Sequence, residues 1–257
     1  MVIRSSQNQK LKTIRRSLKS KGDLAPLEGP HLLDEALRRG VALEDVLMTP
    51  EFLARDEGRA LHARLSRPAI EVDQALLRTL TDADAPQGSL AIARLPRHGV
   101  GALPRRTDGI YVYAERLQDP GNVGALARSA EAAGAVGLAL GPGSAHPNHP
   151  RALRASAGSL LRLPIAVQAD AAELFAYLAD LAPRSIALDP HTGDELYSAP
   201  LTGTLVLLLG SEGPGLSAEL LAGAHLRLRI PLAAGVESLN ATIAAAVVLF
   251  EIHRRRG

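Results

Sequence analysis

Residues 109–135 read GIYVYAERLQDPGNVGALARSAEAAGA, and this stretch changes its pattern from that of a strand to that of a helix. The run GIYVYA is short and apolar, Pro120 and Gly121 favour a turn, and Asn122 can cap a helix. Apolar or small residues then recur at helical spacing, namely Val123, Leu126, Ala127, Ala130 and Gly134. The stretch therefore predicts a strand, a turn and a helix, the unit of an open α/β sheet.

Arg128 lies off the apolar stripe of this helix. Open α/β sheets hold their ligands at the carboxyl ends of the strands, so the Arg128 guanidinium can point at a ligand. A surface ion pair with Glu131, three residues later, would explain the arginine without any function. The stretch alone leaves both interpretations open.

Downstream of this unit, apolar runs alternate with helical stretches. The runs are VGLALG at 136–141, LPIAV at 163–167, RSIALD at 184–189 and TLVLLLG at 204–210, and AAELFAYLADLA at 171–182 is a helical stretch. Apolar runs that alternate with helices predict an α/β fold with a mostly parallel sheet, covered on both faces.

The last segment, ESLNATIAAAVVLFEIHRRRG at 237–257, predicts a long closing helix. Its apolar residues at helical spacing are Leu239, Ile243, Ala246, Val247 and Phe250. The arginines that follow complement the negative end of the helix dipole.

The first ninety residues have mixed patterns. HLLDEALRRG at 31–40 predicts a helix, and VLMT, AIEV and SLAIARL are short candidate strands. The segment 94–107 is rich in Pro, Gly and Arg and has no apolar period, which is typical of a linker. We therefore expect a small α/β domain at 1–95, a linker at 96–106 and a larger domain at 107–257.

Composition excludes several classes of protein. No uninterrupted apolar run reaches the length of a membrane span, and the N-terminal segment lacks the apolar part of a signal peptide, so we expect a cytoplasmic protein. Cysteine is absent, which excludes disulfides, Cys-ligated zinc and a cysteine nucleophile. The eight histidines show no zinc-helix spacing, and we expect no metal site.

Positive charge is clustered although the net charge is only +2. Residues 1–21 contain seven basic residues and no acidic one, and residues 94–106 add four arginines without an acid. Such clusters suit the phosphate backbone of RNA, but solvated helix faces carry similar runs of charge. Aromatic residues make up 3% of the chain and offer few surfaces on which bases could stack.

Two further glycine-bearing motifs follow strands. In LLLGSEGPGLSAE at 207–219, an apolar strand leads into a glycine loop with the carboxylate of Glu212, and Ser217 then caps a helix. The motif is neither a Walker loop nor a dinucleotide fingerprint. In LRIPLAAGVESLNATIAAAVVLFE at 228–251, Ser238 is the expected N-cap of the last helix, and Asn240 is less expected inside a helix.

Taken together and in this order, DPGNVGALARSAEAAG, LGSEGPGL and IPLAAGVESLNATIAAAVVLFE resemble the SpoU (TrmH-like) family of RNA ribose 2′-O-methyltransferases, within the SPOUT superfamily. RALRASAGSLLRLPI at 151–165 looks like a fourth family segment. The resemblance covers 107–257. It extends to SSQNQKLK, LEGPHLLDEAL and APQGSLAI, which are similar to the family's small, ribosomal-protein-like substrate-binding domain.

The resemblance implies a trefoil-knotted C-terminal sheet, a homodimer, and S-adenosylmethionine as cofactor. It implies that Gly210, Ile230 and Leu239 contact the cofactor, and that the pocket also involves Glu212, Gly213, Pro231 and Ser238. The implied catalytic residues are Arg128, Asn122, Glu212, Ser238 and Asn240. Candidate RNA contacts are Gln7, Asn8, Lys10, Arg15, Arg16, Lys19 and Arg154.

The chemistry that the resemblance implies is methyl transfer from sulfonium sulfur to a ribose 2′-hydroxyl, with RNA as partner. A guanidinium resists deprotonation, so we expect Arg128 to bind a phosphate and stabilise the developing alkoxide, rather than to act as a simple base. Ribosomal RNA is favoured as substrate. The alternatives are a tRNA 2′-O-methyltransferase and a catalytically silent RNA-binding or ribosome-assembly protein.

Overall fold

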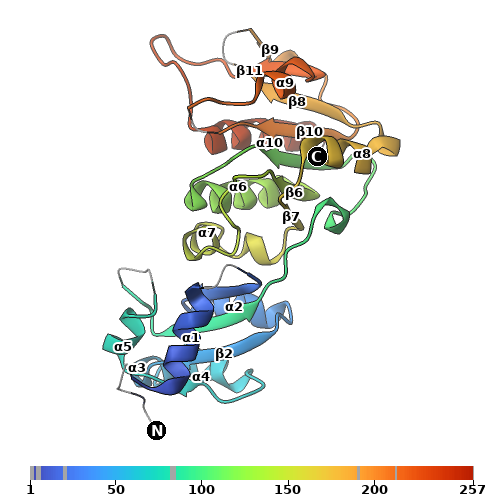
Figure 1. Cartoon of the computed structure of the whole chain (residues 1–257). Coiled ribbons are helices and arrows are strands. Elements are labelled where there is room, and N and C mark those ends of the chain that lie inside the picture. The colour runs from blue at the N-terminus through green and yellow to red at the C-terminus, as the bar shows by residue number, and fades with distance from the viewer. Residues whose placement is uncertain are drawn as a thin grey trace. The chain divides into compact units, whose positions relative to one another are not determined.

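The structure is a computed structural model that describes residues 3, 7–19, 22–81, 85–189, 192–211 and 213–256. The chain forms two compact units (Figure 1). Unit 1 contains residues 1–96 and 147–161, and unit 2 contains residues 97–146 and 162–257. Among the described residues, none of the helices combines the length and the apolarity that crossing a membrane requires.

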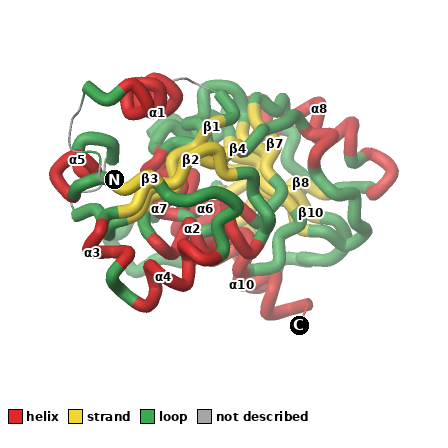
Figure 2. The backbone as a smooth tube through the Cα atoms, turned by 90° about the horizontal axis from the view of Figure 1, so that it is seen from below, coloured by secondary structure: helices red, strands yellow, loops and turns green. Residues whose placement is uncertain are grey.

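Unit 1 is built on a four-stranded sheet with the strand order β1-β4-β2-β3 (Figure 2). Strand β4 pairs antiparallel with β1 and β2, and β3 pairs parallel with β2. The strands are β1 (Leu24–Glu28), β2 (Leu43–Met48), β3 (Ile70–Glu71) and β4 (Ser89–Arg94). The helices are α1 (Gln9–Lys19), α2 (Pro30–Arg38), α3 (Pro50–Leu53), α4 (Asp56–Ala63), α5 (Gln74–Arg78) and α7 (Pro150–Ala155), with a 3-10 turn η2 (Ser159–Leu161).

The basic N-terminal segment forms helix α1, which is amphipathic. Leu11 and Ile14 are almost fully buried and pack with residues of the sheet such as Leu47 and Leu90. The neighbouring positions Lys10 and Lys12 are exposed. Spacing of three residues between the buried side chains places them on one face, so the helix buries its apolar face and leaves its charge outside.

Residues 147–161, which the sequence assigned to the C-terminal domain, belong to unit 1. Asn148 donates hydrogen bonds from Nδ2 to the carbonyl oxygens of Leu95 (2.9 Å) and Gly22 (3.4 Å). Arg154 on α7 forms an ion pair with Glu28 at the end of β1. These polar contacts join segments more than fifty residues apart, which is why a boundary drawn from composition did not find them.

Unit 2 contains a seven-stranded sheet with the order β7-β6-β5-β10-β8-β11-β9, and every pair of neighbours is parallel. The predicted α/β fold with a mostly parallel sheet is therefore confirmed, while the knot stays a prediction. The strands are β5 (Ile110–Ala114), β6 (Gly137–Leu140), β7 (Ile165–Val167), β8 (Arg184–Leu188), β9 (Asp194–Glu195), β10 (Leu205–Leu209) and β11 (Leu226–Arg229).

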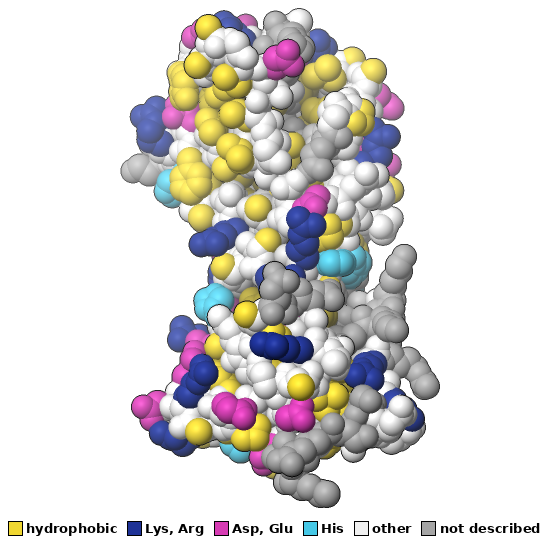
Figure 3. Space-filling view, turned by 90° about the vertical axis from the view of Figure 1, so that its left-hand side faces the viewer, with side chains coloured by type: hydrophobic (Ala, Val, Ile, Leu, Met, Phe, Trp, Pro, Cys, Tyr) yellow, Lys and Arg dark blue, Asp and Glu magenta, His cyan; other side chains and the backbone are white. Residues whose placement is uncertain are grey.

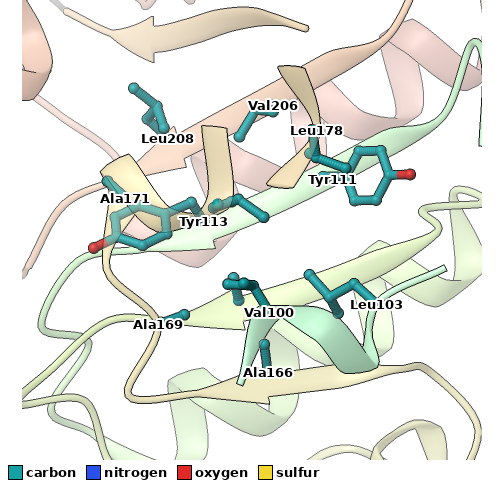
Figure 4. Packing of buried hydrophobic residues seen from close by; sticks show 12 residues of the cluster. Val100, Leu103, Tyr111, Tyr113, Ala166, Ala169, Ala171, Leu178, Val206 and Leu208 are labelled. Atoms are coloured by element: carbon teal, nitrogen blue, oxygen red, sulfur yellow. The ribbon is translucent and has the colours of Figure 1, made fainter. Parts of the chain in front are cut away.

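The helices of unit 2 are α6 (Pro120–Ala132), α8 (Ala171–Tyr177), α9 (Ala218–Ala222) and α10 (Ala241–Arg256), with 3-10 turns η1 (Val100–Ala102), η3 (Ala179–Leu181) and η4 (Leu196–Ser198). Alternate residues of the central strands face opposite ways. Tyr113 and Leu208 pack on one face with Val100 and Leu178 (Figure 4). Helices α6 and α10 pack against each other and against β6 and β10.

The expected linker at 96–106 is mostly packed into unit 2. Val100 and Leu103 are 4% and 2% exposed and belong to the apolar cluster of Figure 4. The Tyr111 hydroxyl donates to the carbonyl oxygen of Pro104 (2.8 Å), and Tyr177 donates to that of Leu103 (2.7 Å). Two apolar residues three positions apart are too short a pattern to stand out among proline, glycine and arginine.

The apolar stripe noted in the sequence of α10 is only partly buried, because Ala246 and Val247 are half-buried while Ile243 and Phe250 are exposed. The buried residues are Ala245, Val248, Leu249 and Ile252. Ile243 and Phe250 from the predicted stripe are 56% and 47% exposed. The helix is apolar on more than one side, so its periodicity alone does not say which side meets the sheet.

Candidate functional site

A cavity of about 450 Å³ lies in unit 2 at the carboxyl ends of β8, β10 and β11. This is the edge of a parallel sheet at which α/β proteins bind their ligands. The walls combine apolar side chains with the backbone of two glycine-bearing loops. The lining residues are 188, 208–211, 213, 215, 216, 228–230, 232, 238–241 and 244.

The loop after β10 is a tight hairpin. The backbone N–H of Ser211 donates to the Gly215 carbonyl (3.1 Å), and that of Gly215 donates to the Ser211 carbonyl (3.0 Å). A Cβ atom at Gly210 would lie 2.0 Å from the carbonyl carbon of Gly215, so only glycine fits there. Gly213 has a φ of 95°, which favours glycine. Glu212 lies outside the described residues.

Glu115 fixes this hairpin to the neighbouring strand. It directly follows β5, and its backbone N–H donates to the carbonyl oxygen of Leu209 at the end of β10 (2.7 Å). Its side-chain Oε2 accepts a hydrogen bond from the backbone N–H of Ser217 (2.7 Å). Glu115 is not among the site residues predicted from the sequence. Its signal was that of a lone carboxylate directly after a buried strand, within the quoted stretch.

The charge of Glu115 also acts on Tyr113, two residues earlier on the same strand. Burial, assisted by the carboxylates of Glu115 and Asp170, raises the pKa of Tyr113 to about 12. The phenol therefore stays protonated even near pH 10, where an ordinary tyrosine is half ionised. Ser217 caps α9 as expected, because its hydroxyl accepts from the backbone N–H of Leu220 (3.4 Å).

The third loop joins β11 to α10 and completes the cavity with Ile230, Ser238, Leu239 and Asn240. The N-cap of α10 is Asn240 and not Ser238, because Asn240 Oδ1 accepts from the backbone N–H of Thr242 (2.9 Å). Ser238 remains in the loop and lines the cavity. Serine and asparagine are equally good caps, so their order in the chain did not decide between them.

Helix α6 begins at Pro120, two residues before Asn122. Asp119 is its N-cap and accepts from the backbone N–H of Asn122 through Oδ1 (3.0 Å), and Pro120 is the first helical residue. The expectation that Asn122 caps the helix is therefore wrong. The predicted buried stripe is confirmed for Val123, Leu126, Ala127 and Ala130, whereas Gly134 lies beyond the helix and is exposed.

Arg128 is exposed on the outer side of α6. The ion pair with Glu131 that would have explained it does not form, because Glu131 instead pairs with Arg162 through two hydrogen bonds of 2.6 and 2.7 Å. Within the part of the chain that is described, no hydrogen bond or ion pair involves the Arg128 guanidinium. A cation held on a rigid helix without an internal partner is available to a ligand.

The glycine-bearing motifs at 207–219 and 228–251 both line the cavity, whereas the strand–turn–helix stretch at 109–135 does not. Gly210, Gly213, Ile230, Ser238, Leu239 and Asn240 line it. Pro231, Asn122 and Arg128 are not part of that lining, as far as the described residues go. One chain therefore presents a pocket on one loop cluster and an unpaired arginine on another element.

The candidate RNA contacts have partners in unit 1. Asn8 caps α1 by accepting from the backbone N–H of Lys10 (2.9 Å), and Lys10 pairs with Asp45 (2.7 Å). Arg15 donates to the hydroxyl of Thr79 (2.7 Å). Gln7 is exposed, and Arg154 pairs with Glu28 as described above. The side chains of Arg16 and Lys19 lie outside the described residues.

Within the described residues, no cluster of three or more His, Asp or Glu side chains could hold a metal ion. The walls of the cavity are mainly apolar side chains and backbone amides. Such a lining suits an organic ligand with a flat apolar part and a few hydrogen-bonding groups.

Known proteins match both units. The model of the SpoU rRNA methylase family matches residues 109–250, and that of the MRM3-like substrate binding domain matches residues 8–91. An uncharacterized tRNA/rRNA methyltransferase of Synechocystis is 31% identical over 99% of this chain and 94% of its own length. The 23S rRNA (guanosine(2553)-2′-O)-methyltransferase RlmP of Bacillus subtilis is 26% identical over 97% of this chain and 98% of its own.

Solved structures agree with these matches. The SpoU methyltransferase AviRb of Streptomyces viridochromogenes, in complex with the cofactor AdoMet, superposes with a TM-score of 0.88 at 26% identity and covers 97% of this chain and 98% of its own. The likeness spans both units, and the family model spans more than half of the chain. The chain therefore belongs to the SpoU rRNA methylase family.

Proposed function

We propose that this protein transfers a methyl group from S-adenosylmethionine to a ribose 2′-hydroxyl of ribosomal RNA. The observation that carries the proposal is the cavity at the carboxyl ends of β8, β10 and β11, built by the two motifs that resemble the family's signatures. Relatives named as 23S rRNA 2′-O-methyltransferases, and a related structure with bound AdoMet, support it.

The cavity fits S-adenosylmethionine by the chemistry of its lining. Ile230 and Leu239 offer apolar contacts to a purine, and the backbone around Gly210 and Gly213 offers amide groups to its polar edges. Ser238 adds a hydroxyl. From the resemblance, Glu212 shapes the same loop, and Pro231 stiffens the exit of β11. When bound, the cofactor supplies an electrophilic methyl group on its sulfonium.

Arg128 binds the RNA that accepts the methyl group. Its guanidinium carries a permanent positive charge and a fork of donors that matches a phosphate or an alkoxide. It therefore binds the phosphate beside the target ribose and stabilises negative charge on the 2′-oxygen as this oxygen accepts the methyl group and its proton passes to solvent water. Asn122, in the first turn of the same helix, and the amide of Asn240 orient the ribose. Because Oδ1 of Asn240 caps α10, only its Nδ2 is available for this role.

The protein acts as a homodimer, in which α10 supplies part of the interface. Ile243 and Phe250 are large apolar side chains exposed on that helix, and Val236 is exposed in the loop before it. Figure 3 shows hydrophobic side chains gathered on the part of its view that belongs to unit 2. A second copy would cover this surface, and it offers a route by which Arg128 of one protomer reaches the cavity of its partner.

Unit 1 binds the RNA, and unit 2 performs the transfer. The match to a substrate-binding domain supports the first role, and the basic helix α1 is consistent with phosphate contacts from Gln7, Lys10, Arg16 and Lys19. Like Gln7 and Lys10, the residues Asn8, Arg15 and Arg154 have internal partners, and all five would need to serve RNA besides those partners. The reaction takes place in the cytoplasm, where ribosomal RNA is found.

The test is a transfer assay with tritiated S-adenosylmethionine, using unmodified 23S rRNA and tRNA transcripts as acceptors. We expect label in the ribosomal RNA, recovered as a ribose-methylated nucleotide after nuclease digestion. Label in tRNA alone would favour the tRNA alternative. An absence of label in both, with RNA binding intact, would favour a catalytically silent RNA-binding protein.

A further inference from the structure

Two residues that line one cavity of unit 1, Thr81 and Ser89, carry buried hydroxyl groups without hydrogen-bond partners. Among the described residues, three buried side-chain oxygens have no hydrogen-bond partner, namely those of Thr81, Ser89 and Thr204. Thr81 and Ser89 line the same cavity, whose volume is about 280 Å³. Ser89 is only 1% exposed. Leaving a buried hydroxyl unpaired costs stability, so a pair of them at one cavity calls for an explanation.

The start of helix α2 forms the next part of the wall. Gly29 precedes this nine-residue helix with a φ of 89°, and no side chain caps it. The backbone N–H of Gly29 donates to the carbonyl oxygen of Ser89 (3.0 Å), so the unpaired hydroxyl belongs to the direct neighbour of the helix start. The N-terminal end of a helix carries partial positive charge and free N–H groups, which suit a phosphate.

The other polar side chains that line the cavity either can donate hydrogen bonds or form an ion pair with each other. Arg154 and Glu28 both line the cavity and pair with each other. His31 contacts the carbonyl oxygen of Ala157 through Nε2 (3.2 Å). Gln87 is exposed at the edge, and a Cβ atom at Gly29 would lie 3.0 Å from its Oε1. The amide of Gln87 and the two hydroxyls can each both donate and accept, as the edge of a nucleobase requires.

The cavity is also part of a longer depression. His31 and Gln87 line both it and a neighbouring cavity of about 600 Å³, which contains Arg55. Arg55 is exposed, and in the described part of the chain its guanidinium has no hydrogen-bond or ion-pair partner. The neighbouring cavity also contains Asp34, which pairs with Arg64, and Glu57, so Arg55 contributes a cation to a lining of mixed charge.

We propose that this cavity of unit 1 holds one unpaired nucleotide of the RNA substrate, with a base edge at Thr81 and Ser89 and its phosphate at the start of α2. The inference rests on the proposed function, because it takes RNA as the substrate. The recognition is by hydrogen bonds and shape, in a single-stranded segment whose base can turn outward.

The experiment compares Ser89→Ala, Thr81→Val, the double variant and the matched control Thr204→Val. Each single substitution removes an unpaired buried hydroxyl, and the hydroxyl of Thr204 belongs to unit 2 and is not part of the cavity lining. Binding is measured by fluorescence anisotropy with a labelled, single-stranded RNA decamer of random sequence. Thermal unfolding and the affinity for S-adenosylmethionine are measured on the same samples.

Removing a hydroxyl that has no partner should leave the melting temperature unchanged or higher in every variant. We expect Ser89→Ala and Thr81→Val to weaken RNA binding, by about tenfold in combination, and Thr204→Val to bind RNA as the unchanged protein does. Cofactor affinity stays the same throughout. RNA binding at the original strength in the double variant, or an equal loss in the control, would overturn the proposal.

The decamer assay does not depend on methyl transfer. A protein that transfers no methyl group, yet loses RNA affinity through Ser89 and Thr81, would overturn the proposed activity and uphold the cavity as an RNA site. If the double variant methylates ribosomal RNA with an unchanged KM for the RNA, the proposed activity is upheld and the cavity as an RNA site is overturned.

Discussion

The Arg128 side chain is exposed on a helix and has no hydrogen-bond or ion-pair partner among the described residues. Arg128→Ala should abolish methyl transfer to ribosomal RNA, because the phosphate and the alkoxide lose the cation that the proposed mechanism assigns to them. Cofactor affinity should stay within a few fold, since Arg128 is not part of the described cavity lining. The thermal midpoint should not move. The rate is measured by label incorporation and the affinity by calorimetry.

Arg162→Ala is the matched control for that experiment. It breaks the bidentate pair with Glu131 and should lower the thermal midpoint by a few degrees, with transfer retained below that temperature. If Arg128→Ala instead abolished cofactor binding, Arg128 would have a structural role and the proposed contact with RNA would be refuted.

A second residue-scale prediction concerns Glu115. Glu115→Gln replaces a carboxylate that accepts from the Ser217 N–H with a neutral amide, and this weakens the attachment of the hairpin 210–216. We expect about tenfold weaker binding of S-adenosylmethionine, with kcat at saturating cofactor largely retained. Calorimetry and the dependence of the rate on cofactor concentration measure the two effects. Exposed Glu173→Gln should change neither, and a fall in kcat alone would contradict a positioning role.

At the scale of elements, what could be read from the sequence depended on how local the deciding interaction is. The strands 110–114, 137–140 and 205–209 and the helix 120–132 follow from apolar runs and turn residues within each segment. The cap of α10 was placed at Ser238 because two good capping residues stand two positions apart. The choice of Asn240 reflects the course of the loop around the cavity, which no local pattern encodes.

The end of α10 gives a prediction at this scale. Arg254 and Arg255 donate to Glu251 and lower its pKa from 4.5 to about 2. A folded pKa below the unfolded value means that ionised Glu251 stabilises the fold above pH 4.5 and that this contribution disappears as the pH falls toward 2. Arg255 also donates to the carbonyl oxygens of Leu196 and Tyr197, so the pair supports the loop after β9.

Glu251→Gln should therefore lower the thermal midpoint at pH 7 and flatten its decline between pH 4.5 and pH 2, relative to the unchanged protein. Differential scanning calorimetry over this range makes the measurement. The exposed Glu237→Gln serves as the control and should follow the unchanged curve. Parallel curves for Glu251→Gln and the unchanged protein would show that the carboxylate does not contribute in this way.

For the whole molecule, composition and motif order predicted an α/β protein of this family, but not how the chain is divided in space. Residues 147–161 belong to unit 1 through Asn148 and Arg154, whose partners are distant in sequence. The alanines and arginines of this segment resemble the composition of the larger domain, so composition marks no domain boundary there. The separation of Arg128 from the cavity of its own chain was equally hidden, because motif order says nothing of which protomer a side chain serves.

That separation makes the homodimer a requirement of the proposed mechanism, and exposed residues of α10 allow it to be tested. Ile243 and Phe250 are seven positions apart and share one face of the helix. Ile243→Asp with Phe250→Asp should give a folded monomer by light scattering, with cofactor affinity retained and transfer lost. Tyr197→Asp, at another exposed apolar side chain, should leave the dimer intact.

Complementation then decides whether Arg128 acts across the interface. Gly210→Ala places a Cβ atom against Gly215 and so disables the cavity, whereas Arg128→Ala disables the cation. Each variant alone should be inactive. In a mixed dimer, the intact cavity of one protomer meets the intact Arg128 of its partner, so an equal mixture should recover about a quarter of the original activity. A site that used Arg128 of its own chain would gain no activity from mixing. A mixture that contains mixed dimers but stays inactive would therefore refute a site shared between protomers, and Arg128 would then serve the cavity of its own protomer.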